Sequence, residues 1–311
     1  MLVAVSACCI AGTTPAQTYP YKPVRIVTSE VGGSADFQSR LIGHGIAAAL
    51  GQQVIVENRG GGVIPGDTVA KALPDGYTLL YTGSAHWLLP LMRDNVPYDP
   101  VKDFAPITLP VRAPNLLVVH PSVPAQSVRE LIALAKAKPG ALNYGSGAPG
   151  SSSHLAPELF KAMAGVDIVH IPYKGTGPAI NDLLGGQLQM MFPNAAAVMP
   201  HVKAGRLRAL GVSSAQPSPL APGVPTVSAG LPGFESVSNL GIFAPARTPA
   251  AVIRRLNQEV VRYLQTAEAK ERMLNAGVET VGSTPEQLAA VVNAEMARMG
   301  RIIKSVGIRA D

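Results

Sequence analysis

The feature that most constrains the fold is a repeated order of short apolar strand, glycine-serine loop and helix. Near the start of the chain, the apolar run 24–27 leads into TSEVGGSAD and an amphipathic segment from Phe37 to Leu50, which Gly51 closes. Near the middle, residues 142–144 lead into GSGAPGSSS and a second helical segment. Strands and helices that alternate in this way predict parallel strands and an α/β fold.

The rest of the chain divides this pattern into two lobes and a helical tail. After the strand GIFA at 241–244, the sequence becomes mostly helical, and the capping box TPEQ at 284–287 opens a long last helix. A chain of 311 residues is long enough for two lobes, and ligands of such folds bind where parallel strands end. We therefore expect two α/β lobes around a ligand cleft with a helical C-terminal return, with residues 17–120 and 244–311 in lobe 1 and residues 121–243 in lobe 2. Further strands are expected at 53–57, 77–82, 115–119, 167–171, 189–192 and 207–212.

Composition excludes several classes of protein. With 47% hydrophobic and 15% charged residues, the chain has the composition of a globular protein and not of a disordered one. The net charge is +6, but the lysines and arginines are scattered and no basic run carries interleaved aromatics. We expect no nucleic-acid partner.

The N-terminus indicates export. Residues 2–12 form an apolar run that is too short to span a membrane, and TPA at 14–16 resembles a small-residue cleavage site before Gln17. No basic segment precedes the run, so residues 1–16 are interpreted as a truncated signal peptide. A rival interpretation is a lipoprotein box, VSAC at 5–8, with a lipid on Cys8. Cys8 and Cys9 are the only cysteines, so a chain cut after Ala16 would have no disulfide and no cysteine nucleophile.

The hexapeptide GSGAPG at 145–150 fits the dinucleotide-binding pattern G-x-G-x-x-G. That function also needs an acidic residue at the end of the following strand, where it binds the ribose. Asp167 instead precedes the strand, and Pro172, Tyr173 and Lys174 follow it. We therefore expect no dinucleotide and no other cofactor.

A carboxylate site explains these glycines better. Ser151 and Ser152 lie where a helix begins, and such a position offers unpaired N–H groups and the positive end of the helix dipole. The first loop has the same form, with Gly32, Gly33 and Ser34 before a helix. Two such loops facing each other across a cleft could each hold a carboxylate. The alternative is that both are ordinary strand-to-helix turns with serine caps.

Nothing in the sequence assembles an enzyme. The pattern G-x-S-x-G is absent, no spacing links a serine, a histidine and an aspartate, and the six histidines are isolated, with no H-E-x-x-H metal motif. His86 and His154 are candidates for ligand contact because both follow predicted strands. Trp87, the only tryptophan, either lines the cleft or packs beneath it.

Taken together, these motifs resemble the Bug family of periplasmic solute receptors, the binding components of tripartite tricarboxylate transporters. The resemblance covers nearly all of the chain after residue 16. It rests on GGSAD at 32–36, VIVENR at 54–59, PDGYTLL at 74–80, PYDPVKDFAPIT at 97–108, the long stretch from LNYGSGAPGSSSHLA to NDLLGG at 142–186, AGRLRALGV at 204–212 and GIFAPARTPA at 241–250.

The resemblance implies a type II periplasmic-binding-protein fold and no enzymatic activity. It implies a small carboxylated ligand held by backbone N–H groups, hydroxyls and ordered waters, and transporter membrane subunits as partners of a monomeric periplasmic receptor. A sensor that passes the same binding event to a signalling kinase is the alternative. With the two histidines included, the candidate ligand-binding residues are Ser29, Glu30, Val31, Gly32, Gly33, Ser34, Ser84, Ala85, His86, Ser146, Gly147, Ser151, Ser152, His154, Tyr173, Pro193 and Asn194.

Two departures from the family pattern affect the ligand. Where the family commonly has Pro-Phe-Pro before the glycines, this chain has Thr28, Ser29 and Glu30. A carboxylate at Glu30 would repel an anionic ligand unless it points away or the ligand carries a cation. Pro193 stands where the family often has an aspartate, which removes an acceptor for an amino or hydroxyl group.

Overall fold

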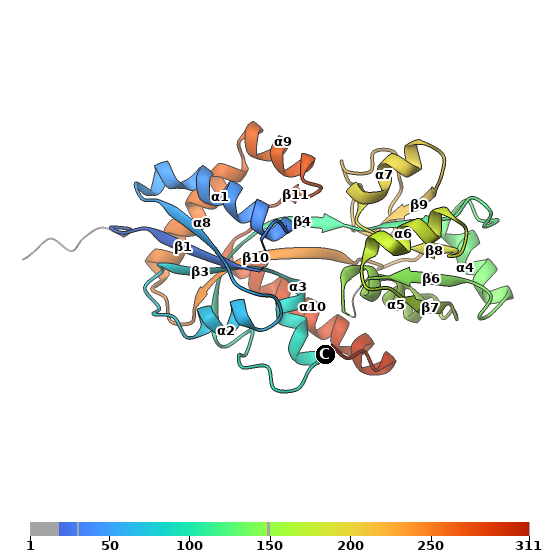
Figure 1. The fold of residues 1–311 in the computed structure, drawn as a ribbon, viewed down its shortest axis with the longest axis horizontal. Coiled ribbons are helices and arrows are strands. Elements are labelled where there is room, and N and C mark those ends of the chain that lie inside the picture. Colours follow the sequence, from blue (N-terminus) through green and yellow to red (C-terminus); the bar gives the residue numbers. More distant parts are fainter. Residues whose placement is uncertain (1–18, 30, 148–149, 311) are drawn as a thin grey trace, which may run out of the picture.

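The computed structural model describes residues 19–29, 31–147 and 150–310, which form two lobes side by side along the long axis of the molecule (Figure 1). Each lobe has its own mixed β-sheet with helices on both faces. The predicted architecture of two α/β lobes with a helical C-terminal return is confirmed. The predictions about the signal peptide, Cys8 and Glu30 fall on residues outside the described ranges.

The sheet of the first lobe has six strands in the order β11-β4-β10-β3-β1-β2. Strand β1 runs parallel to both β2 and β3, so the loops that follow β1 and β3 leave from the same edge of the sheet. Strand β10 is antiparallel to β3 and β4, and β11 is antiparallel to β4. The strands are β1 (Val24–Thr28), β2 (Val54–Asn58), β3 (Thr78–Gly83), β4 (Phe104–Pro114), β10 (Val237–Pro245) and β11 (Glu279–Thr280).

Helices cover both faces of this sheet because its strands bury side chains on both sides. Ile26 of β1 belongs to the hydrophobic cluster on one face, and the next residue, Val27, belongs to the cluster on the other. In Figure 1, α1, α8 and α9 lie over one face and α2, α3 and α10 over the other. Their bounds are α1 (Ser34–Leu50), α2 (Ile64–Ala70), α3 (Ser84–Leu88), the 3₁₀ turn η1 (Leu89–Leu91), α8 (Ala250–Leu264), α9 (Ala267–Asn275) and α10 (Pro285–Val306).

The sheet of the second lobe has five strands in the order β7-β6-β8-β5-β9. Strand β6 runs parallel to β7 and β8, whereas β5 is antiparallel to β8 and β9. The strands are β5 (Leu116–Val119), β6 (Asn143–Ser146), β7 (Val169–Pro172), β8 (Met190–Met191) and β9 (Arg208–Val212). The helices are α4 (Val128–Ala137), α5 (Ser152–Ala164), α6 (Thr176–Leu184), α7 (Ala195–Lys203) and the 3₁₀ turn η2 (Val227–Ala229).

The chain crosses between the lobes at two adjacent strands of the first sheet. Strand β4 ends at Pro114, Asn115 follows, and β5 begins the second sheet. The boundary expected at 120/121 therefore lies too late, because β5 pairs with β8 and β9. The boundary expected at 243/244 falls inside β10, which pairs with strands of the first sheet from Val237 onward. The apolar sequence of a run such as 115–119 does not reveal which of the two sheets the strand joins. The expected lobe boundaries therefore differ from those in the structure.

Strand β4, the crossing strand itself, was not predicted. Its sequence, FAPITLPVRAP, contains three prolines, and proline cannot donate to a strand ladder. The structure accommodates Pro110 where the register between β4 and β10 slips, between Leu240 and Ile242. A bulge in a long strand, which the sequence does not reveal, therefore carries the chain from one lobe to the other.

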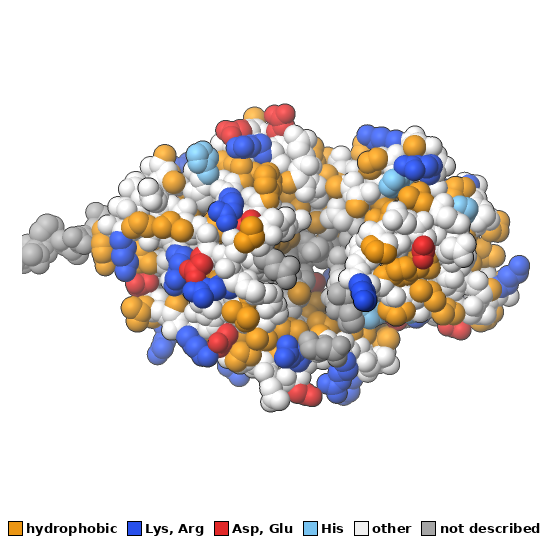
Figure 2. Space-filling model, in the orientation of Figure 1, with side chains coloured by type: hydrophobic (Ala, Val, Ile, Leu, Met, Phe, Trp, Pro, Cys, Tyr) orange, Lys and Arg blue, Asp and Glu red, His pale blue; other side chains and the backbone are white. Residues whose placement is uncertain are grey.

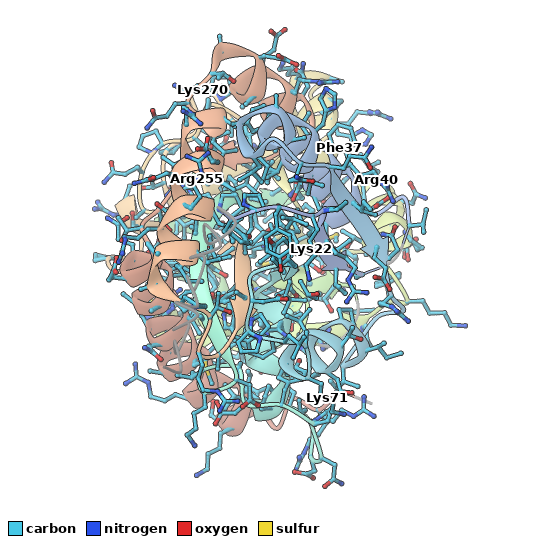
Figure 3. All side chains as sticks on the ribbon, turned by 90° about the vertical axis from the view of Figure 1, so that its left-hand side faces the viewer. Lys22, Phe37, Arg40, Lys71, Arg255 and Lys270 are labelled. Atoms are coloured by element: carbon cyan, nitrogen blue, oxygen red, sulfur yellow. The ribbon has the colours of Figure 1, made fainter. Side chains whose placement is uncertain are left out.

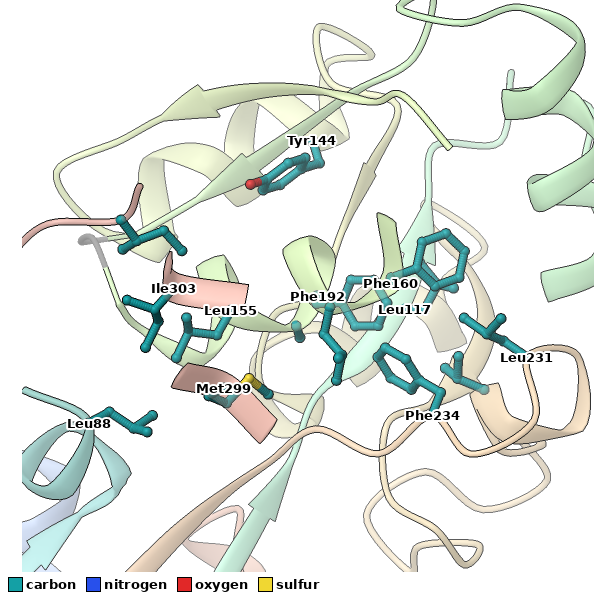
Figure 4. Close-up of a cluster of buried hydrophobic side chains, with 14 of the residues drawn as sticks. Leu88, Leu117, Tyr144, Leu155, Phe160, Phe192, Leu231, Phe234, Met299 and Ile303 are labelled. Atoms are coloured by element: carbon teal, nitrogen blue, oxygen red, sulfur yellow. The ribbon is translucent and has the colours of Figure 1, made fainter. Parts of the chain in front are cut away.

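One hydrophobic cluster continues through both lobes. It contains Trp87 of the first lobe and Phe160 of the second. Figure 4 shows Leu155 of α5 beside Met299 and Ile303 of α10, so the C-terminal helix packs against the second lobe as well as the first. This places α10 under the junction of the two lobes, where a ligand cleft would have its base.

Among the described residues, no helix combines the length and the apolarity needed to cross a membrane. The same residues contain no group of three or more histidine, cysteine, aspartate or glutamate side chains arranged to hold a metal ion.

Candidate functional site

The first-lobe loop after β1 leaves the start of α1 without a side-chain cap. Gly32 has a φ of +79°, a left-handed conformation that favours glycine, and the extended Gly33 is the N-cap of α1 with no side-chain cap. Within the described ranges, the N–H groups of Ser34 and Ala35 have no acceptor. The residues from Val31 to Ser34 are exposed, and α1 begins at the end of lobe 1 that faces lobe 2 (Figure 1).

Asp36, which sequence reasoning missed as a site residue, holds this loop. Its carboxylate is 6% exposed and accepts hydrogen bonds from the Gly32 N–H at 2.9 Å, Arg40 Nε at 2.8 Å and Asn58 Nδ2 at 2.9 Å. The Asn58 amide also donates to the Ser29 carbonyl. Burial alone would raise the pKa of Asp36, but the bonds from Gly32 and Asn58 and the charge of Arg40 (Figure 3) outweigh it and lower that pKa.

The second-lobe loop after β6 likewise leaves the start of α5 without a side-chain cap. The Gly147 N–H donates to Ser153 Oγ at 3.0 Å, and Ser153 Oγ also bonds Ser151 Oγ at 3.0 Å. Ser151 is the N-cap of α5, yet its hydroxyl caps no backbone N–H. As in α1, the N–H groups of Ser152 and Ser153 have no acceptor among residues 19–29, 31–147 and 150–310.

Two stacked imidazoles lie beneath this loop. The rings of His154 and His170 stack with centroids 4.4 Å apart, and Tyr144 stacks on the other face of this pair at 4.7 Å from His170. His154 Nδ1 accepts from the Gly150 N–H at 3.2 Å, and His170 Nε2 bonds Ser146 Oγ at 2.7 Å. Burial lowers the pKa of His154, and burial with the neighbouring His154 lowers the pKa of His170 to about 4. Both rings are therefore neutral at pH 7 and hold Ser146 and Gly150 in place.

Four of the candidate residues, two from each lobe, meet at a cavity of about 240 Å³ (Figure 2 shows the surface hollowed between the lobes). Ser84 and Ala85 line it from lobe 1, and Ser151 and Ser152 line it from lobe 2. Its remaining lining residues come from the neighbouring loops, β10, α5 and α10: Gly83, Gly150, Leu155, Ser236, Val237, Ser238, Glu295 and Met299. Among the described residues, no lysine or arginine lines this cavity.

A larger cavity of about 420 Å³ shares the lining residues Val237 and Glu295 with the first. Arg112, Arg298 and Glu235 line it, and neither glycine-serine loop reaches it. Of the two loops, only the one before α5 lines the smaller cavity, and residues 31–34 line neither cavity. We therefore place the candidate site in the smaller cavity, where both lobes contribute.

Glu295 of α10 is the second residue that sequence reasoning missed. It is 6% exposed, and its Oε2 accepts from Trp87 Nε1 at 3.1 Å, Ser84 Oγ at 3.2 Å and Asn239 Nδ2 at 3.3 Å. Burial raises the pKa of Glu295, although these hydrogen bonds and the nearby charge of Arg298 oppose the rise. Trp87 therefore packs beneath the cleft and does not line it.

Several other candidate residues lie outside the cavity. His86 is 6% exposed and stacks on Tyr98 at 4.4 Å, and burial lowers its pKa to about 3, so the structure gives it a place in the core. Tyr173 donates to Asp182 at 2.6 Å, and this bond raises the pKa of Tyr173 to about 12. The Pro193 carbonyl accepts from the Leu116 N–H, and Asn194 caps α7 through Ala196.

The glycines of the hexapeptide at 145–150 have packing roles. A Cβ on Gly145 would lie 2.4 Å from Leu188, and one on Gly150 would lie 2.5 Å from Met92 Sδ. Gly150 also has a φ of +74°. Asp167 precedes β7, at the end away from the cleft loops, and its carbonyl accepts from Gly140. Gly145 and Gly150 are therefore required by close packing, and Gly150 also by its left-handed backbone.

Comparisons with known proteins agree with the two-lobed architecture. A family model described as the tripartite tricarboxylate transporter family receptor matches residues 39–308. The protein BugT of Bordetella pertussis is 37% identical over 307 residues, which cover 96% of this chain and 94% of BugT.

Solved structures give the same result. A protein of R. palustris solved with adipate is 35% identical with a TM-score of 0.75, and the match covers 94% of this chain and 99% of that one. MatC from Rhodopseudomonas palustris with bound malate is 30% identical with a TM-score of 0.71, over 92% and 100% of the two chains. A TctC solute-binding protein from Polaromonas, without ligand, is 25% identical with a TM-score of 0.85, over 93% and 100%. The chain therefore belongs to the tripartite tricarboxylate transporter receptor family and has its type II periplasmic-binding-protein fold.

Proposed function

We propose that this receptor captures a small organic carboxylate between the start of α1 in one lobe and the start of α5 in the other. The observation that carries the proposal is that neither helix start has a side-chain cap: the N-cap of α1 is Gly33, and the Ser151 hydroxyl caps no backbone N–H of α5. Relatives of similar fold bind adipate and malate, which are carboxylates.

Binding without a cation is physically sufficient here. The free N–H groups of a first helical turn and the positive end of the helix dipole both favour an anion. The hydroxyls of Ser151 and Ser152 add donors at the same place. A carboxylate shared between two such helix starts would bridge the lobes, so the ligand would favour a closed form over an open one.

We infer that the form described here is open. Val31 is 76% exposed in the first-lobe loop, although it lies beside the proposed ligand position. The overall match is also better to the ligand-free Polaromonas protein, at a TM-score of 0.85, than to the adipate-bound protein at 0.75, despite the lower sequence identity. On closure, the exposed loop from Val31 to Ser34 would approach α5.

The family to which the chain belongs supports a proposal about its physiological setting. We propose a periplasmic monomer that presents its closed form to the membrane subunits of a tripartite tricarboxylate-type transporter. The Pro193 carbonyl accepts a hydrogen bond from the Leu116 N–H, and the Pro193 side chain has no acceptor. We therefore expect this position to favour ligands without an amino or hydroxyl group that needs an acceptor. The effect of Glu30 on the anion site remains a prediction.

A charge placed at the start of α1 tests the site. Ser34→Asp puts a carboxylate where the ligand carboxylate would bind, and two such charges about 4 Å apart repel by about 4 kcal/mol at an effective dielectric of about 20. Affinity for adipate or malate, measured by calorimetry, should fall about 1,000-fold.

The matched control is Ala267→Asp, which adds the same charge at the first position of α9, an exposed site remote from the cleft. It should leave affinity unchanged. An acid that binds the wild type and the Ser34→Asp variant equally well would refute the assignment of α1 to the site.

A further inference from the structure

The carboxylate of Glu295 connects the cavity wall to other elements of the fold by hydrogen bonds. Glu295 lies in α10, lines the cavity and is almost fully buried. Its three hydrogen-bond donors come from different parts of the fold: Ser84 and Trp87 from α3, and Asn239 from β10. Ser84 is itself a lining residue of the cavity, and β10 is one of the strands at which the chain crosses between the lobes.

Ser84 is held from two sides within this cluster. Its hydroxyl lies 3.2 Å from Glu295 Oε2 and 3.4 Å from the Asn239 carbonyl, and it accepts from the Asn239 N–H at 3.3 Å. Because one hydroxyl has one proton, its orientation depends on which acceptor takes that proton. A charged carboxylate is the stronger acceptor, so the Ser84 proton points to Glu295, and this bond holds the Ser84 side chain in place at the cavity wall.

The same helix also supports the opposite wall. Met299 lies one turn after Glu295 on α10 and lines the same cavity. It packs in one buried cluster with Leu155 of α5, the helix whose start carries Ser151 and Ser152 (Figure 4). One turn of α10 therefore contacts the first-lobe wall through Glu295 and the second-lobe wall through Met299.

We propose that Glu295 is a positioning residue for ligand binding. Its hydrogen bonds hold the part of the cavity wall that contains Ser84 against α10 and against β10, a strand at which the chain crosses between the lobes. Through α10, this wall is placed relative to the start of α5. The proposal rests on the ligand site proposed above and adds a residue that acts through Ser84. Arg298, one turn further along, forms no hydrogen bond or ion pair with Glu295 among the described residues, so the three donors are what orient the carboxylate.

The substitution Glu295→Met removes the acceptor at similar size, whereas Glu295→Gln keeps an amide oxygen for the three donors. Amide hydrogen exchange in residues 83–88 and 237–240 should speed up about tenfold or more in Glu295→Met, because no acceptor is left for the three donors and local opening there no longer breaks these hydrogen bonds. In Glu295→Gln it should stay within about threefold of the wild type. Glu286→Met, the same change at an exposed position of α10, is the control.

Affinity for adipate provides the second readout. Both substitutions remove the Glu295 charge from the cavity wall, so they are compared with each other. Glu295→Met should bind adipate about tenfold or more weakly than Glu295→Gln, which keeps the acceptor oxygen. Ser84→Ala, which leaves Glu295 with two donors, should weaken binding in the same direction. The double variant should lose no more than Glu295→Met alone, since both changes act through one hydroxyl. Should Glu295→Met fail to fold, Ser84→Ala and Glu295→Gln give the same comparison.

Unchanged exchange in residues 83–88 and 237–240 of Glu295→Met would overturn the proposal, as would additive losses of affinity in the double variant. If the wild type binds no carboxylate, the proposed function fails, while the exchange measurement still decides the role of Glu295.

Discussion

Replacing Asp36 by asparagine should destabilise the fold and weaken the hydrogen bonds that hold the loop between β1 and α1. The carboxylate accepts from Gly32, Arg40 and Asn58 at 2.8–2.9 Å while 6% exposed. Asparagine has one acceptor oxygen, and its NH₂ group must face at least one of these three donors. A lost hydrogen bond to a charged group costs about 1.5–3 kcal/mol, which is the expected fall in the free energy of unfolding.

The pH dependence of this effect follows from the pKa of Asp36, which lies below its ordinary value of 3.8 in the folded chain. A lowered carboxylate pKa stabilises the fold in full above the unfolded pKa and loses this contribution as pH falls through the folded pKa. Urea denaturation of the wild type and Asp36→Asn should therefore differ by a constant amount between about pH 5 and 8 and converge below about pH 4.

Asp94→Asn is the control for this measurement, because the Asp94 side chain is 87% exposed and its ion pair with Arg309 spans 3.5 Å. Its effect should stay below about 0.5 kcal/mol. A loss of less than about 0.5 kcal/mol in Asp36→Asn as well would refute the claim that this carboxylate holds the loop.

Two further predictions concern the second lobe. Phe160→Ala, at a fully buried ring 5.8 Å from Phe192 and 6.1 Å from Phe234, should lower the free energy of unfolding by about 3–5 kcal/mol in urea denaturation, and a loss under about 1 kcal/mol would contradict this packing. His170→Gln should reduce the loss of stability on acidification. The pKa of His170 falls from 6.5 to about 4 on folding, so the unfolded chain binds a proton at a higher pH than the folded chain. The free energy of unfolding therefore declines as the pH falls from 6.5 to about 4 in the wild type. An unaltered pH slope in that variant would show that His170 is not the neutral partner of Ser146.

Local signals in the sequence predicted the elements that depend on neighbouring residues. The capping box at Thr284 forms with both of its hydrogen bonds, to and from Gln287. The start of α5 after Ser151 also lies where the serines indicated it, whereas α1 begins at Ser34, three residues before the segment expected from Phe37. Such features are readable because the groups that satisfy one another lie within a few residues along the chain.

The parts that were missed depend on contacts between distant segments. Trp87 and Glu295 are 208 positions apart and meet only when α3 and α10 pack on the same face of the sheet. Asp36 meets Asn58 from the neighbouring strand β2. His86 and His154 both follow strands in the sequence, yet burial places one in the core and the other beneath a loop. Periodicity and spacing do not distinguish such positions from ligand contacts.

The central claim is that a carboxylate is held at two helix starts without a cation. Its most direct test is a thermal-shift titration of the chain against mono-, di- and tricarboxylates and aromatic acids, each paired with its amide. An amide has no negative charge for the helix dipoles to stabilise, so the account predicts that the melting temperature rises with one or more acids and not with the matching amides. A rise with neutral compounds only, or with no acid at all, would contradict it.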